Sequence, residues 1–459
     1  MSGQPEGITA YAAYLPRHRL GHEELAAELG TRAGKGRRVI ASYDEDSTTM
    51  AVEAARRVAG SHDAAPGAIY FATTTPSYLD KANATAVHAA LDLGHEGFAA
   101  DVAGSARSAV AALRAASGSG GLAVMADMRT GLPTSSDERD GADGAAAFAY
   151  GPGAAVEIVS RAATTAEFLD RWRRPGAIAA RQWEERFGLE VYMPLIRDAV
   201  SRALADAGLE RADHVVVSSP HARAAATAMR ELGAAPRPDG LGYAGAADLG
   251  LRLAATLDRA RPGDTVLSVS AADGCDAAVL RVGEGIEAAR RGPSVAEQLE
   301  GGREVTYATY LMWRGLLERE PPRRPDPERP AGPPSARAEA WKFAFVGSRC
   351  RRCGHVHVPP RRVCVGCGAV DDMERAPLAG KQGTVATYTV DRLAFSPSPP
   401  MIDAVVDFDG GGRYTLEVTD AAPEEVDIGT RLELTFRRLY TTAGIHNYFW
   451  KVRPAEPAG

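Results

Sequence analysis

Four cysteines in two CxxC pairs are the clearest chemical signal in the sequence. Cys350 and Cys353 form the first pair, Cys364 and Cys367 form the second, and a glycine follows each pair. Pairs at this spacing can supply four thiolates to one tetrahedral zinc ion, with each pair on a tight turn that the glycine permits. Two disulfides would instead require an oxidising compartment, which nothing in the sequence indicates. We therefore expect a structural zinc site, because four protein ligands leave no position open for a substrate.

Length, composition, charge and cysteine count limit the kinds of protein that this chain can be. At 459 residues the chain is longer than one ordinary domain, and its 45% hydrophobic and 24% charged residues are typical of a globular protein. A net charge of −6 without a basic stripe argues against nucleic acid as a partner. We see neither a signal peptide nor the run of about 20 apolar residues that a membrane span requires. With only five cysteines, four of them in the pairs, we expect a cytoplasmic protein.

Strand and helix patterns alternate over the first 300 residues and follow a similar order in two successive halves. This alternation predicts a layered α/β domain, and the repeated strand–turn–helix junctions indicate an internal duplication. In the first half, strands are expected at 7–14, 67–73, 97–103, 121–127, 144–149 and 154–159, with helices from Ser47, from about Lys81 and over 106–117. In the second half, helices are expected at 189–207, 222–232 and 244–260, with strands at 214–219, 265–270 and 276–282.

The remaining third of the chain has a different pattern. Residues 304–319 predict an aromatic-rich helix, and the proline-rich stretch 320–336 cannot continue it, so a domain boundary is expected there. The cysteine pairs place a ribbon at about 345–370. From 380 onward, short alternating segments predict a small closed barrel, most simply an OB-fold. Its five strands are expected at 383–390, 401–408, 414–418, 432–436 and 448–452.

Several stretches carry a resemblance to known families. The first domain resembles the thiolase superfamily, and within it the 3-hydroxy-3-methylglutaryl-CoA synthases and ketoacyl synthase III enzymes. The matching stretches begin at Tyr14, Asp44, Asp101, Asp143, Ser219 and Gly242. The C-terminal part resembles zinc-ribbon/OB-fold proteins that accompany thiolase-type acyl-CoA enzymes, so the chain looks like a fusion. The resemblance implies a thiolase-like αβαβα domain over 1–300, a helix and linker over 301–344, a zinc ribbon over 345–372 and an OB-fold over 373–459.

The resemblance also implies catalytic residues that this chain largely lacks. Condensing enzymes of this type need a cysteine at the start of a buried central helix, where the helix dipole favours the thiolate. They add a histidine, an asparagine and, in the synthases, a glutamate. Here Ala106 falls at the cysteine position, Thr74 at the glutamate position and Tyr243 at the asparagine position, while His221 is retained. We therefore do not expect condensation through a covalent acyl-cysteine.

Other side chains could take over the missing catalytic roles, and each of them also has a purely structural interpretation. Ser105 could be a nucleophile activated by His221, or one of the small residues that cap the helix. His221 could take part in catalysis or remain a core histidine. Tyr243, paired with His221, could act as a general acid/base, as in thiolase-fold relatives that cleave carbon–carbon bonds by retro-aldol chemistry. Cys275 is read as a small buried residue, and Arg107 as surface rather than a CoA phosphate ligand.

Two classes of function remain open. The chain is expected to be an acyl-CoA-handling subunit of a thiolase-type complex that makes or breaks carbon–carbon bonds by acyl transfer, condensation or retro-aldol cleavage. Alternatively, it is a non-catalytic scaffold that channels substrate to an active thiolase. The expected ligands are a structural zinc ion and a coenzyme A thioester as substrate; the CoA-binding residues are unknown. The expected partners are a second copy of the chain, a thiolase-family protein or both. Nucleic-acid binding by the barrel is a weaker third reading.

Overall fold

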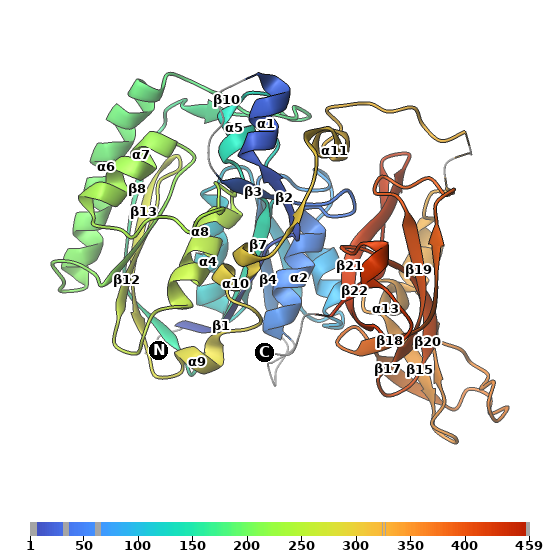
Figure 1. Ribbon diagram of the computed structural model, residues 1–459. Helices are drawn as coiled ribbons and strands as arrows, with labels where there is room; N and C mark the ends of the chain where they lie inside the picture. The colour runs from blue at the N-terminus through green and yellow to red at the C-terminus, as the bar shows by residue number, and fades with distance from the viewer. Residues whose placement is uncertain (1–6, 31–35, 60–65, 324, 326, 456–459) are drawn as a thin grey trace. The chain divides into compact units, whose positions relative to one another are not determined.

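The chain folds into two compact units, which Figure 1 shows in the computed structural model. The structure describes residues 7–30, 36–59, 66–323, 325 and 327–455. The first unit holds residues up to 42, together with 46–87 and 95–316. The second unit holds residues from 317 onward and two short segments from the first part of the sequence, 43–45 and 88–94.

A nine-stranded sheet in the order β11-β12-β13-β8-β1-β7-β6-β4-β5 forms the frame of the first unit. Its strands are β1 (Gly7–Tyr14), β4 (Ala68–Thr73), β5 (Phe98–Ala103), β6 (Leu122–Asp127), β7 (Gly144–Gly151), β8 (Val156–Thr165), β11 (His214–Ser218), β12 (Thr265–Ser270) and β13 (Gly274–Val282). The run β4-β6-β7-β1 has one parallel and then two antiparallel pairings, and β11-β12-β13-β8 repeats the same pairings. This repetition confirms the expected duplicated fold; only the first half has an additional outer strand, β5.

Five helices complete the layers of the first unit. They are α2 (Ser47–Ala59), α4 (Ser108–Ser119), α6 (Glu185–Asp206), α7 (Ala222–Glu231) and α8 (Ala247–Leu257). Helices α4 and α8 contact each other and lie between the two half-sheets, where α8 contacts both β7 and β11. Helix α2 packs on the first half-sheet, and α6 with α7 packs on the second (Figure 1). The layering is therefore the predicted αβαβα arrangement.

Smaller elements surround these layers. The helices are α1 (His22–Leu29), α3 (Ala84–Ala90), α5 (Ser136–Asp140), α9 (Ile286–Ala289), α10 (Val295–Glu300) and α11 (Tyr307–Trp313). The strands are β2 (His18–Gly21), β3 (Arg37–Ile40) and β14 (Arg303–Glu304) in one sheet, and β9 (Arg171–Trp172) with β10 (Arg181–Gln182) in another. Among the described residues, no helix is both long and apolar enough to span a bilayer.

The prediction for residues 304–319 was wrong in part. The aromatic helix expected over 304–319 is only α11, because Glu304 pairs as a strand with β2 and Gly315 adopts a left-handed φ of 67°. The proline-rich stretch does not continue this helix, as predicted, but a separate short helix, α12 (Gly332–Arg337), forms at its end. Its prolines lie in the first turn, where the missing amide hydrogens would have had no helical partner, so they do not prevent helix formation.

The second unit contains a ribbon and a barrel. The ribbon strands are β15 (Val346–Cys350), β16 (Val356–His357) and β17 (Met373–Pro377), and the short helix α13 (Glu339–Lys342) precedes them. The barrel strands are β18 (Gln382–Asp391), β19 (Met401–Phe408), β20 (Arg413–Val418), β21 (Arg431–Thr442) and β22 (Ile445–Pro454). They close in the order β18-β19-β20-β22-β21, with β20 and β22 parallel. This barrel confirms the predicted OB-fold.

A buried charge cluster lies beside the barrel, within the second unit. Lys451 of β22 bonds Asp44 at 2.9 Å, and Arg437 of β21 bonds Glu45 at 3.1 Å and Asp420 at 2.7 Å. All five side chains are buried. Asp44 and Glu45 come just before the helix that starts at Ser47, but it is Asp46 that caps the helix, by accepting a hydrogen bond from the Thr49 amide. Asp44 and Glu45 can be buried because each pairs with a buried cationic side chain.

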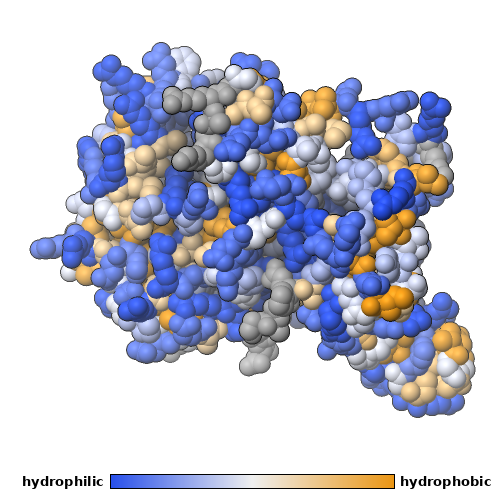
Figure 2. Space-filling model, in the orientation of Figure 1, coloured by the Kyte–Doolittle hydropathy of each residue, from blue (hydrophilic) through white to orange (hydrophobic). Residues whose placement is uncertain are grey.

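The visible surface is mostly hydrophilic, with apolar residues in small separate groups (Figure 2). The larger apolar side chains are mainly inside, in one core cluster around α4 and α8 and another between α6, α7 and the second half-sheet. The candidate functional residues are therefore buried or half-buried polar side chains, and they do not form a broad apolar surface.

Candidate functional site

The junction between β5 and α4 carries Ser105, Ala106 and Arg107. Gly104 makes the turn with a φ of 131°, and α4 begins at Ser108. The Ala106 methyl group is half-buried. Ser105 Oγ accepts a hydrogen bond from the Arg107 amide at 3.2 Å, and among the described residues none of its hydrogen bonds involves His221. The helix start therefore presents a methyl group and a locally bonded hydroxyl.

Arg107 is fixed by three acceptors rather than lying in solvent as the sequence suggested. Its guanidinium donates to Asp276 at 2.7 Å, to the carbonyl of Asp273 at 2.8 Å and to the carbonyl of Thr164 at 3.1 Å. These bonds tie the start of α4 to β8 and to the turn between β12 and β13. Arg107 therefore holds the junction in place and has few donors left for a ligand.

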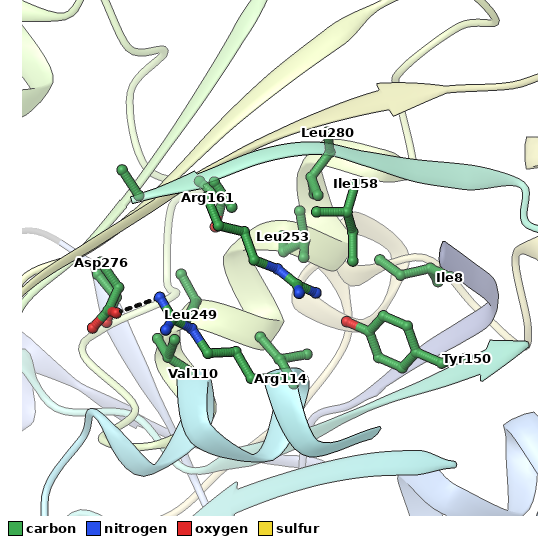
Figure 3. A pocket seen from close by; sticks show the side chains of 15 residues that line it. Ile8, Val110, Arg114, Tyr150, Ile158, Arg161, Leu249, Leu253, Asp276 and Leu280 are labelled. Atoms are coloured by element: carbon green, nitrogen blue, oxygen red, sulfur yellow. Dashed lines mark hydrogen bonds and ion pairs between the residues drawn. The ribbon is translucent and has the colours of Figure 1, made fainter. Parts of the chain in front are cut away.

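A small cavity extends along α4 beyond this junction, between the two half-sheets (Figure 3). Its volume is about 60 Å³, and its lining is mainly aliphatic. Arg114 bonds Asp276 at 2.9 Å, and the Arg161 guanidinium points toward the hydroxyl of Tyr150 (Figure 3). Burial and then Arg114 lower the pKa of Arg161, while Tyr150 acts in the opposite sense. The cavity holds no more than a few methylene groups or one to two waters.

Thr74 is held by Asp127, the last residue of β6. The carboxylate of Asp127 accepts from the Thr74 amide and hydroxyl, both at 2.7 Å, from the Thr73 and Thr75 hydroxyls and from the Ala246 amide. A Cβ at Gly245, whose φ is 59°, would overlap this carboxylate. Asp127 is completely buried, so these donors replace the water it lost. It therefore organises the threonine loop that the sequence placed at the glutamate position.

Tyr243 lies against Arg129, which follows β6. The guanidinium carbon of Arg129 is 5.5 Å from the centroid of the Tyr243 ring, a cation–π distance. The Tyr243 hydroxyl makes no hydrogen bond to any described residue, and burial raises the pKa of this phenol despite the opposing charge of Arg129. The phenol therefore stays protonated at neutral pH and is a hydrogen-bond donor.

His221 caps α7 and is completely buried. Its Nδ1 accepts from the Ala224 amide at 3.0 Å, so the neutral ring carries its proton on Nε2, which donates to the Glu185 carbonyl at 2.8 Å. His221 and Tyr243 do not contact each other. The structure therefore brings Thr74 and Tyr243 to the surroundings of Arg129, and holds His221 between α6 and α7.

Asp170 lies close to His221 and was not identified from the sequence. A Cβ on Gly188 of α6 would be 2.5 Å from Asp170 Oδ1 and 2.6 Å from His221 Nε2, so the two side chains flank one point. Asp170 is 2% exposed, and neither carboxyl oxygen has a hydrogen-bond partner among the described residues. Burial raises the pKa of Asp170, against the opposing effects of His221 and Arg171. Burial therefore makes the ionised form of Asp170 more costly than it would be in water.

The residues that follow Asp170 bring two arginines toward Arg129. Arg171 and Arg129 both pair with Asp137 of α5, Arg129 at 3.5 Å. Burial would raise the pKa of Asp137, but these two arginines outweigh it and hold the pKa below its usual value. The guanidinium of Arg173 donates to the carbonyl of Thr74. Cationic side chains thus gather around the threonine loop.

Cys275 is the only cysteine of the first unit. It lies near the start of β13 and is completely buried, as the sequence suggested. Burial and the neighbouring Asp276 raise its pKa to about 12. The thiolate is therefore scarce at neutral pH, and Cys275 is a poor nucleophile.

The four ribbon cysteines come together in the second unit. Their sulfur atoms all lie within 4.8 Å of one another, with Cys350–Cys367 at 3.7 Å and Cys353–Cys364 at 3.4 Å. Tetrahedral zinc with Zn–S bonds of about 2.3 Å needs sulfur separations of roughly 3.8 Å, so the set fits the ion. Gly354 and Gly368 have φ of 75° and 72°, and their amides donate to Cys350 and Cys364. The predicted glycine turns are present.

Comparisons with known proteins extend this description. Two family models match the second unit: "ChsH2, rubredoxin-like zinc ribbon domain" over residues 343–374 and "ChsH2, C-terminal OB-fold domain" over residues 376–437. The hydroxymethylglutaryl-CoA synthase of Archaeoglobus fulgidus is 32% identical over 342 residues, covering 68% of this chain and 99% of the relative. That of Methanopyrus kandleri is 34% identical over 344 residues, covering 68% and 98%. The chain belongs to the hydroxymethylglutaryl-CoA synthase family. The resemblance seen in the sequence is confirmed.

Other matches concern the two units separately. A DUF35 domain-containing scaffold protein of Methanocaldococcus jannaschii is 34% identical over 120 residues, covering 25% of this chain and 84% of the relative. A structure of HMG-CoA synthase complexed with CoA matches with a TM-score of 0.59 at 14% identity, covering 69% of this chain and 91% of its own. MvaS in complex with 3-hydroxy-3-methylglutaryl coenzyme A matches at 0.56 and 20% identity, covering 71% and 95%. These structural matches support the fold.

Sequence reasoning missed the side chains that surround Thr74 and His221 in this member of the family. The missed residues are Asp127, Arg129, Asp137, Asp170, Arg171 and Arg173. The Arg-Trp-Arg-Arg run at 171–174 was a local signal for a cationic segment. No local sequence pattern identified Asp127, which ends β6, or Asp170, which precedes β9, because their neighbours in the fold lie far away in the sequence.

Proposed function

We propose that this chain is an acyl-CoA-handling subunit of a thiolase-type complex, and that it makes or breaks a carbon–carbon bond without a covalent acyl-cysteine. Membership of a synthase family named for a CoA thioester supports the acyl-CoA part. The ribbon and barrel support work in a complex, since they match a relative described as a scaffold protein. A zinc–thiolate site and the free thiol of Cys275 suit a reducing compartment, so we place the chain in the cytoplasm.

One observation carries the noncovalent part of the proposal. The start of α4 presents Ala106, and the only cysteine of the same unit is buried with a pKa raised to about 12. A methyl group cannot attack a thioester, and a buried neutral thiol reacts slowly. Carbon–carbon chemistry at this site would then depend on stabilising the enolate or oxyanion rather than on acyl transfer to sulfur.

Tyr243 is the side chain best suited to that stabilisation. Its phenol is protonated at neutral pH, and its hydroxyl makes no hydrogen bond to the described residues, so it can donate one to a thioester oxygen. In this proposal, His221 positions α6 against α7, because both ring nitrogens bind main-chain groups. Ser105 and Thr74 shape the surroundings, and the ribbon cysteines hold structural zinc. We also propose that the chain associates with a second copy or with another thiolase-fold protein.

Turnover assays of the purified chain test this proposal. The chain is incubated with acetyl-CoA, acetoacetyl-CoA or 3-hydroxy-3-methylglutaryl-CoA, alone and with any partner recovered by pull-down. Tyr243→Phe should lower turnover by about 10²- to 10⁴-fold, the usual contribution of a general acid. His221→Asn retains a helix cap but has no imidazole, so it should leave most activity in place. Tyr388→Phe in the barrel strand β18 is the matched control and should change nothing.

The scaffold function is the second candidate, and the engaged state of Ser105 and His221 favours it. It would replace the first proposal if turnover appeared only with a co-purified thiolase and survived Tyr243→Phe. Activity of the isolated chain that is lost with Tyr243→Phe alone would support the enzyme.

A further inference from the structure

The acidic pair Asp44 and Glu45 belongs to the second unit, although helix α2 of the first unit begins shortly after it. The ammonium group of Lys451 in β22 lies 2.9 Å from the Asp44 carboxylate, and the guanidinium of Arg437 in β21 lies 3.1 Å from that of Glu45. The main-chain amide of Arg438 donates to the carbonyl of Asp44 at 2.9 Å. The barrel therefore holds both the side chains and the backbone of this acidic pair.

Burial makes these ion pairs difficult to open. The two cations and the two acids are all 0% exposed. Burial alone would lower the pKa of Lys451, but Asp44, Tyr43 and Glu417 outweigh it and raise the pKa. The ammonium group therefore stays charged at neutral pH. Because separation would leave uncompensated charges in the interior, the acidic pair stays fixed to the barrel.

Asp46 follows the acidic pair directly and fixes the start of α2. Its carboxylate accepts a hydrogen bond from the Thr49 amide at 2.9 Å, and its own amide donates to the Thr49 hydroxyl at 2.8 Å. Reciprocal bonds of this kind resemble a capping box, which holds the first turn of a helix in place. One peptide bond therefore connects the acidic pair held by the barrel to a well-supported helix start.

The first turn of α2 holds the threonine loop of the first unit. Ser47 Oγ donates to the carbonyl of Thr75 at 2.7 Å, and Thr48 Oγ1 lies 2.9 Å from Ser77 Oγ. Ser47 and Thr48 are each 1% exposed, so water hardly competes for these bonds. Thr74, the residue at the glutamate position, immediately precedes Thr75. The first turn of α2 therefore supports the backbone next to Thr74.

We propose that Lys451 and Arg437 are positioning residues for the threonine loop. They act through the two acids that they hold and through the first turn of α2. The barrel then helps to shape the site of the first unit, in addition to any role in a complex. This inference rests on the proposed function, because that proposal makes Thr74 part of the site. Site residues keep a productive geometry only when a second layer of bonds holds them.

Hydrogen exchange followed by mass spectrometry on the zinc-loaded full chain tests this role without substrate. The Thr74 and Thr75 amides donate to Asp127 and should exchange slowly in wild type. Lys451→Met should speed exchange of the loop by about tenfold or more, because the released acidic pair lets the first turn of α2 move. Exchange of β12 should not change. Lys381→Met alters an exposed lysine just before β18 and should leave both regions as in wild type.

Ser47→Ala combined with Thr48→Val tests the second step and leaves the ion pairs in place. The double variant removes both side-chain bonds to the loop, so it should also speed loop exchange by about tenfold. It should not alter exchange of the barrel strands β21 and β22.

Three results would overturn the positioning role. Unchanged loop exchange in Lys451→Met would show that the loop does not depend on the ion pair, and unchanged exchange in the double variant would exclude the route through α2. Equal acceleration of the loop and of β12 in Lys451→Met would show that the ion pair stabilises the chain as a whole. A wild type without acyl-CoA turnover would refute the proposed function, whereas faster loop exchange in the variants would still establish the positioning.

Discussion

At the scale of single residues, Asp170 is a buried acid of the first unit that no hydrogen bond to a described residue compensates. A carboxyl group that is 98% buried and has no hydrogen-bond partner among the described residues carries a desolvation cost. His221 and Arg171 reduce that cost without removing it, since the pKa stays raised. Strained or uncompensated groups of this kind often lie near functional sites, where they are retained at the expense of stability.

Asp170→Asn should stabilise the protein by about 1 kcal/mol at pH 7, because it removes the buried charge. The folded-state pKa of Asp170 is raised, so wild type loses stability as pH rises from the unfolded pKa of about 3.9 through the folded value. The advantage of Asn should therefore shrink toward pH 4. Denaturant unfolding at several pH values measures the difference.

Asp206→Asn is the control for that comparison, because Asp206 is an exposed aspartate, at the end of helix α6. It should change the free energy of unfolding by less than about 0.5 kcal/mol. A loss of stability in Asp170→Asn that grows toward neutral pH would show that the ionised carboxylate is stabilised in the folded protein.

Residues whose role depends on near neighbours in the sequence could be predicted. The four ribbon cysteines and their glycines follow from spacing alone, whereas the assignment of Ala106 to the nucleophile position came from the family resemblance. We could not predict that Arg129 pairs with Asp137, or that Asp170 lies beside His221. Tertiary packing brings those residues together.

At the scale of elements, hydrophobic pattern and turn residues predicted most strands and helices closely. Strand β1 spans the predicted 7–14, and β19 the predicted 401–408. The errors have local causes: Gly315 and the pairing of Glu304 shortened α11, and prolines in a first turn allowed α12. The segment 43–45 joined the second unit because Lys451 and Arg437 pair with it, which no local pattern shows.

The ribbon should depend on its metal. Removing zinc with a strong chelator should unfold the ribbon, since metal binding to four thiolates contributes on the order of 10 kcal/mol to folding. Calorimetry with a colorimetric zinc assay should show a lost or lowered transition and release of about one zinc per chain, as one four-thiolate site requires.

Cys353→Ser should reproduce the effect of the chelator, whereas Arg352→Gln, an exposed neighbour that is not a ligand, should retain zinc and the melting profile. Complete metal removal with an unchanged profile would contradict a folding role for the site.

At the scale of the whole molecule, a duplicated synthase-type unit and a ribbon–barrel unit share one chain. The first unit has the family's layers, with one outer strand fewer in its second half. The family's fold is thus retained, while the residues at its central helix start differ from the expected nucleophile. A chain with the family's fold but without the expected nucleophile is compatible with an acyl-CoA enzyme that works without a covalent intermediate.

Intact-mass spectrometry of the full chain during acyl-CoA turnover tests this central claim most directly. We predict that product accumulates while the protein keeps its unmodified mass, because neither Ala106 nor the buried Cys275 can carry an acyl group. An acyl adduct that forms and decays at the rate of turnover, and that maps to Ser105 or Cys275, would contradict it.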